Sequence, residues 1–183
     1  MAEQVVFEQT IEGMFVRGLG GRLTPRAKER LKGIGVDLSR PLLPAYPFDT
    51  WMKSLEIAAQ EVFASHAQDE AMFKLGELLI DGYRETFLGR AVLGFVRVLG
   101  PRRTLGRSTQ NFRSGNNYTE TKVTDLTPTC AELWMNEVGP YPTFTQGILT
   151  AALRASGAEQ LTVVVSQFDG HAATYKVTWA VSP

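Results

Sequence analysis

The sequence is poor in cysteine and histidine, and it has no net charge. It contains one cysteine, Cys130, and two histidines, His66 and His171. A single cysteine excludes an internal disulfide framework and a multi-cysteine zinc site, and it fits a reducing, cytoplasmic compartment. The 19 basic and 19 acidic residues give a formal net charge of +0. The protein therefore has no net charge that would attract nucleic acid or an anionic membrane. Any electrostatic recognition has to come from a local group of charged residues.

Several familiar sequence signatures are also missing. No stretch approaches the roughly 18 uncharged apolar residues of a transmembrane helix. The opening MAEQVVFEQTIEG lacks the basic flank and apolar run of a signal peptide. There is no Walker-type loop, dinucleotide fingerprint or metal-binding histidine pair, so we expect neither a metal nor a cofactor. With 44% hydrophobic residues in a chain of 183, we expect one cytoplasmic domain spanning residues 1–183.

Helix signals begin early in the chain. After a short extended piece, Thr10 is expected to cap a helix that stops at the glycines near position 20. Thr24 as N-cap and Pro25 at the first helical position predict a second helix, which Gly33 ends. The proline-rich SRPLLPAYPFD is predicted to be a rigid connector, because proline interrupts helices. Asp49 is then expected to cap a core-facing helix.

The middle of the chain is predicted to be helical almost without a break. From Asp69 to Leu99 apolar residues recur at spacings of three and four, and the second half is apolar on more than one face. Gly82 and Gly89 are possible places for a bend. One more short helix is expected to start at Pro101 and end near Phe112.

The last third has strand character. NYTETKVTDL and CAELWMNEV predict a hairpin, and LTVVVSQF and AATYKVTWAV flank the turn signal Asp169-Gly170. Between them Thr143 is expected to cap a helix that Gly157 ends. This order predicts an α+β fold, with N-terminal helices packed on a C-terminal four-stranded antiparallel sheet of strand-strand-helix-strand-strand order.

Several segments carry a resemblance to known families. LGPRRTLGR, FRSGNNYTETKV, ELWMNEV, FTQGIL and TYKVTW are similar to those of a myxobacterial family of uncharacterised domains of about this length. The element order more distantly resembles the superfamily of heme-NO-binding domains, four-vinyl-reductase domains and TRAPP subunits. This resemblance implies a ligand-binding or dimerising fold, usually a homodimer joined through its helices. It implies no activity, because the near family has none to carry over. The Tyr-x-Ser-x-Arg motif of the heme-binding relatives and the metal-type cysteines of the four-vinyl-reductase relatives are also missing.

Charge is segregated along the chain. Between Thr86 and Thr119 there are six arginines and no acid, so this segment carries +6 and the rest of the chain −6. Arginine suits phosphate or carboxylate recognition. An anion or nucleotide site is therefore one hypothesis, and pairing of the arginines with acids of the same fold is the other. The candidate ligand-binding residues are Arg102, Arg103, Arg107, Arg113, Asn116 and Asn117, although the two asparagines also suit a structural joint.

Apolar residues of the central helices suggest a second kind of site. Phe73, Tyr83, Phe87 and Phe95 would form a dimer seam between helices or line a hydrophobic pocket. A Cys130–His171 pair is a weaker enzymatic alternative, and we assign no catalytic residue. The function that the sequence favours is a non-enzymatic, homodimeric sensory or interaction domain that binds a protein partner or a small ligand. An anion- or nucleotide-binding regulator is the alternative.

Overall fold

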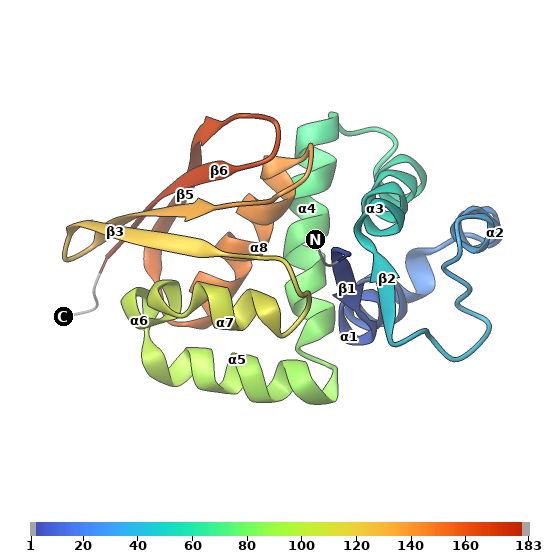
Figure 1. Cartoon of the computed structure of the whole chain (residues 1–183), viewed down its shortest axis with the longest axis horizontal. Helices are drawn as coiled ribbons and strands as arrows, with labels where there is room; N and C mark the ends of the chain where they lie inside the picture. Colours follow the sequence, from blue (N-terminus) through green and yellow to red (C-terminus); the bar gives the residue numbers. More distant parts are fainter. Residues whose placement is uncertain (1–2, 181–183) are drawn as a thin grey trace.

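The computed structural model describes residues 3–180 and places two halves of the chain on either side of a central helix (Figure 1). This helix is α4, Gln68–Tyr83. The N-terminal segments pack on one side of it, and the C-terminal sheet lies on the other. Helix α8, Pro142–Ala155, packs against both α4 and the sheet. The two helices therefore connect the halves of the molecule.

The C-terminal sheet confirms the predicted α+β class. Its strands are β3 (Thr121–Thr127), β4 (Cys130–Met135), β5 (Glu159–Phe168) and β6 (Ala173–Ala180). They are antiparallel in the order β3-β4-β6-β5, so the two predicted hairpins join through β4 and β6. The turn before β6 is as predicted: Gly170 has φ +102°, and the Asp169 carboxylate accepts hydrogen bonds from two backbone N–H groups. The predicted last residue of β6, Val181, lies outside the described residues.

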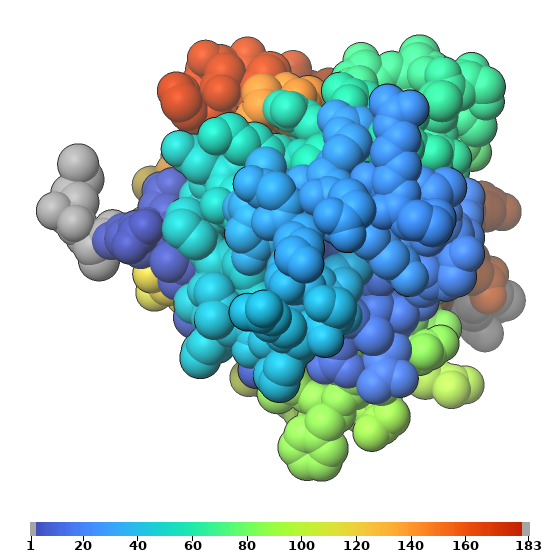
Figure 2. All heavy atoms as spheres, turned by 90° about the vertical axis from the view of Figure 1, so that its right-hand side faces the viewer, coloured from blue at the N-terminus to red at the C-terminus, as the bar shows by residue number. Residues whose placement is uncertain are grey.

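The N-terminal half differs locally from the prediction. Strand β1, Val5–Phe7, pairs with β2, Ala45–Pro47, so the proline-rich connector contains a short strand. Thr10 does not cap a helix but lies within α1, Glu8–Ile11. The chain continues as a π-helical segment, η1 (Glu12–Gly18), and a 3-10 turn, η2 (Gly20–Arg22). Figure 2 shows the segments that follow, α2 and the connector before β2, covering this end of the molecule.

Of the three helix caps predicted after Thr10, Thr24 is right, whereas Asp49 and Thr143 are wrong. Thr24 caps α2, Pro25–Gly33, and its hydroxyl accepts a hydrogen bond from the Ala27 N–H at 3.1 Å. Helix α3, Phe48–Val62, begins one residue before Asp49, directly after the extended Pro47. Helix α8 begins at Pro142 rather than after Thr143, because proline is pre-organised for the first helical position.

The long predicted helix is broken at Thr86. Its hydroxyl donates to the Tyr83 carbonyl at 2.8 Å and accepts from the Gly89 N–H at 3.0 Å, so it ends α4 and caps α5, Phe87–Leu99. A side chain at Gly89 would overlap the Tyr83 carbonyl oxygen, and glycine permits this tight corner. Two short helices follow where one was predicted: α6, Pro101–Gly106, and α7, Ser108–Arg113.

Buried apolar residues form two clusters. One lies among the N-terminal helices and α4, and includes Phe15, Trp51 and Leu75. The other lies between α8 and the sheet, and includes Leu133, Tyr175 and Val177. The predicted inward positions of β6, Tyr175, Val177 and Trp179, are buried. Within residues 3–180, no helix has the length and apolar character needed to cross a membrane.

Candidate functional site

A pocket of about 140 Å³ lies where the two apolar clusters meet, and we call it the junction pocket. Its walls come from both halves of the chain: β1, α3 and α4 on one side, α5 to α8 and β4 on the other. Most of the lining is apolar, including Trp51, Leu93, Leu105 and Leu149. A small, mostly apolar pocket with a few polar groups has the character of a ligand site.

The polar groups of the junction pocket are mainly hydroxyls. Tyr83 and Ser114 form a hydrogen bond between their hydroxyl oxygens at 2.9 Å. Thr10, Thr104 and Ser108 also line the pocket, and among the described lining residues only Glu137 is charged. The Glu137 carboxylate accepts from the Gly139 N–H at 2.9 Å and lies 3.7 Å from the His171 ring, which is exposed. No arginine or lysine is part of the described lining.

Two phenols of the pocket stay protonated over the physiological range. Burial raises the pKa of Tyr83, and the hydrogen bond with Ser114 only partly offsets this effect. Burial also raises the pKa of Tyr118, and the nearby Glu137 carboxylate raises it further because a second negative charge is disfavoured. The pocket therefore carries no phenolate at neutral pH.

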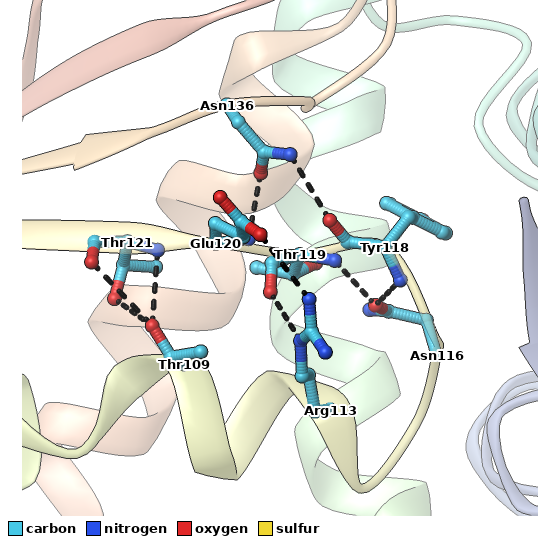
Figure 3. A network of polar contacts seen from close by, with 8 residues as sticks. All are labelled: Thr109, Arg113, Asn116, Tyr118, Thr119, Glu120, Thr121 and Asn136. Atoms are coloured by element: carbon cyan, nitrogen blue, oxygen red, sulfur yellow. Dashed lines mark hydrogen bonds and ion pairs between the residues drawn. The ribbon is translucent and has the colours of Figure 1, made fainter. Parts of the chain in front are cut away.

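The predicted asparagines join segments of the chain. Asn116 Oδ1 accepts from the backbone N–H groups of Tyr118 and Thr119, at 3.1 and 2.9 Å (Figure 3). Asn117 donates to the Glu3 carbonyl and accepts from the Val5 N–H. Figure 3 also shows Asn136, which follows β4, hydrogen-bonded to the same segment: it accepts from the Glu120 N–H and donates to the Tyr118 carbonyl. These bonds place the stretch 116–120 between the two halves, where Asn116 forms part of the pocket wall.

The four predicted arginines do not converge on one point. Arg102 pairs with Asp125 at 2.7 Å, and Arg113 donates to the Thr119 carbonyl and lies 3.5 Å from Glu120. The Arg107 guanidinium lies over the Phe95 ring at 5.0 Å. Arg103 is exposed on α6, with no ion pair among the described residues. Two of the four arginines thus have acidic partners in the same fold, and an anion site on this segment stays a prediction.

The four predicted apolar residues separate into two environments. Tyr83 is buried and lines the junction pocket, whereas Phe87 and Phe95 are exposed on α5. Phe73 is half-buried on α4 and is not among the pocket residues. The sequence did not indicate Leu93, Leu105 or Leu149 as pocket residues. Only a weak sequence signal pointed to these pocket residues. The segment 87–108 is apolar on several faces, and it carries hydroxyl groups at Thr104 and Ser108.

The Cys130–His171 pair does not form. Cys130 lies opposite Thr178 at one end of the β4–β6 ladder, whereas the loop with His171 is hydrogen-bonded to Val138, beyond the other end. Among the described residues there is also no group of three or more His, Cys, Asp or Glu side chains placed to hold a metal ion.

The fold is that of H-NOX domains. An Fe(II) unliganded H-NOX protein from K. algicida superposes with a TM-score of 0.64 at 9% identity, covering 95% of this chain and 96% of that one. An oxygen-binding H-NOX domain related to soluble guanylate cyclases gives a TM-score of 0.59 at 13% identity, covering 93% and 91%. At this identity the likeness concerns the fold alone.

Residues 4–180 match a family described as "Protein of unknown function (DUF2378)", and the chain belongs to that family. The chain has no match among curated proteins. The family matches over nearly the whole chain, in agreement with the resemblance noted from the sequence segments.

Heme is the group to test in this pocket, because heme distortion has been probed in the H-NOX family. The residues of the junction pocket do not fit heme. Proteins hold heme iron through histidine, cysteine, methionine or tyrosinate side chains. The described pocket lining contains no histidine or cysteine, and burial raises the pKa of Tyr83 and of Tyr118, which disfavours the tyrosinate form of both. Met52 and Met135 line it without a histidine to complete an axial pair. Among the lining residues that the structure describes, there is also no arginine, lysine or histidine to pair with the heme propionates.

Proposed function

We propose that this domain is a non-enzymatic sensory module that binds a small ligand in the junction pocket. The observation that carries the proposal is the position of the pocket, between the N-terminal cluster and the α8–sheet cluster. A ligand there contacts both halves and stabilises one arrangement of them, so its binding changes the population of that arrangement. The H-NOX-like fold supports the same class of function by analogy.

Native mass spectrometry tests this proposal. We expect the protein purified without added ligand to retain a small molecule, and to lose it in Ala152→Leu. Ala152 is a small side chain of α8 that lines the pocket, so the larger residue occupies ligand space. Ala155→Leu, on the same helix outside the lining, is the matched control and should keep the extra mass. Equal retention by both variants would contradict the proposal.

We also propose that the domain forms a homodimer through α5. Phe87, Leu88, Ala91, Phe95 and Val98 form an exposed apolar stripe along this helix, with Phe87 85% and Val98 83% exposed. Exposed aromatic and aliphatic residues in one contiguous stripe favour association. The α5 segment forms the lower edge of the molecule in Figure 1.

A second copy in the antiparallel orientation places the apolar stripe of one helix on the stripe of the other. A two-fold axis between Ala91 and Phe95 brings Phe87 close to Val98 of the second copy. The same arrangement places Phe87 near Arg97 of that copy, and Arg97 has no ion pair within the described residues.

The variant Phe87→Arg is expected to weaken the dimer at least about tenfold, because an aromatic anchor is lost and a positive charge is added near Arg97 of the second copy. Sedimentation equilibrium across a concentration series measures the dissociation constant. Phe168→Arg, at a 41% exposed aromatic residue on β5, is the matched control and should dimerise normally. An unmodified protein that stays monomeric, or a Phe87→Arg variant that dimerises normally, would refute this seam.

A further inference from the structure

Three hydroxyl groups around the junction pocket donate their protons to backbone carbonyls of the chain. Thr10 donates to the Gly115 carbonyl at 2.8 Å, and Ser108 to the Leu105 carbonyl at 2.7 Å. Ser114 donates to the Asn111 carbonyl at 2.6 Å. A hydroxyl has one proton and two acceptor lone pairs. Each of these groups therefore presents an acceptor, and no proton, to a ligand.

Tyr83 is the hydrogen-bond donor in its contact with Ser114. Because the Ser114 proton is used on Asn111, the 2.9 Å contact between the two hydroxyls has Tyr83 as donor and Ser114 as acceptor. The Tyr83 oxygen keeps its own lone pairs. The Glu137 carboxylate adds acceptors at another part of the wall. The lining also holds donors, namely the Tyr118 phenol, the Trp51 indole N–H, the hydroxyls of Thr119 and Thr145, and the carboxamide N–H groups of Asn111 and Asn116, but none of them carries a positive charge.

We infer that the junction pocket selects a small, ring-sized molecule that carries no negative charge and has one O–H or N–H group to donate to Tyr83. This inference rests on the proposed function and names its ligand class. An anion would face the Glu137 carboxylate and a set of acceptors, with no arginine or lysine in the described lining to neutralise it. A buried charge without a partner is strongly disfavoured.

The volume supports a ligand of this size. In another protein, an apolar cavity of about 150 Å³ binds benzene. The junction pocket has about 140 Å³, so it accepts a single six-membered ring with a small substituent. A porphyrin is several times larger, so its size excludes it along with its negative charge.

Three probes of nearly equal shape test the inference: phenol, toluene and benzoate. Phenol should bind about five- to tenfold more tightly than toluene, as one added hydrogen bond of about 1 kcal/mol predicts. Benzoate should bind at least about a hundredfold more weakly than phenol, because its charge is not compensated. Quenching or enhancement of Trp51 fluorescence, with calorimetry as a second method, measures each affinity, since Trp51 is part of the lining.

Tyr83→Phe isolates the hydrogen bond. Phenol should then bind no more tightly than toluene, while the affinity for toluene stays unchanged. Tyr141→Phe is the control, because the Tyr141 hydroxyl donates to Glu56 outside the pocket. It should leave both affinities as they are.

The possible results separate the two proposals. If benzoate or heme binds as tightly as phenol, the ligand class is wrong while ligand binding stands. If phenol and toluene bind equally and Tyr83→Phe has no effect, the role of Tyr83 is wrong. If none of the probes binds and none raises the unfolding temperature, the junction pocket is not a ligand site, and the proposed function fails with it.

Discussion

Gly76→Ala is expected to destabilise the protein by at least about 2 kcal/mol. Gly76 lies where α4 crosses α8, and a Cβ there would overlap the Phe144 carbonyl oxygen and lie 2.8 Å from the Ile148 nitrogen. On α8, a Cβ at Gly147 would likewise overlap the Phe73 carbonyl oxygen. The backbones of the two helices are therefore in direct contact. The overlap costs about 3 kcal/mol, whereas the gain from replacing glycine within a helix is about 1 kcal/mol.

Urea unfolding followed by circular dichroism measures this change, and Gly94→Ala is the matched control. Gly94 also lies within a helix, α5, but a Cβ there meets no atom within 4 Å. At protein concentrations where the domain is monomeric, the control should be more stable than the unmodified protein by about 0.5–1 kcal/mol, since only the helix preference of alanine then acts. A Gly76→Ala variant as stable as the control would show that the two helices do not approach as closely as described.

Trp51→Ala is expected to reduce the free energy of unfolding by about 3–5 kcal/mol, the range for removal of a large buried aromatic residue. The Trp51 ring contacts Phe15 at 6.1 Å and Phe144 at 5.8 Å between ring centroids, both in edge-on geometry. It thereby connects α3 to η1 and to α8. Its loss opens a void at the wall of the junction pocket and removes contacts on both sides of it.

Trp134 provides a control of the same residue type. It lies on β4, where alternate residues point inward, and its ring is only half-buried beneath the Lys122 ammonium group at 5.2 Å. Trp134→Ala should cost about 1 kcal/mol, because a partly exposed cross-strand pair contributes far less than a core residue. Equal losses for the two tryptophan variants would mean that Trp51 does not occupy the centre of the core.

Much of the architecture could be predicted from local patterns. The alternation in β6 and the Asp169-Gly170 turn identified a hairpin, and Thr24 with Pro25 identified the start of α2. These features depend on residues only a few positions apart. The break at Thr86 was equally local, because its hydroxyl caps α5, but the continuous apolar pattern on both sides concealed it.

The candidate site was predictable only in part. The sequence proposed a hydrophobic pocket or a dimer seam, and Tyr83 and Phe87 lie in the two different places that these alternatives describe. It also suggested a ligand role for Asn116 and Asn117. Their hydrogen bonds to backbone groups, including Val5 more than a hundred positions away, depend on how the two halves meet.

The sequence by itself determined the α+β class, the two hairpins and the segregation of arginine, because periodicity, turn residues and charge are read directly from neighbouring positions. Only the tertiary structure decided that a pocket exists and that three of its hydroxyl groups present acceptors. The direction of a hydroxyl proton depends on which carbonyl lies within reach. For Thr10 that carbonyl belongs to Gly115, which folding brings beside it.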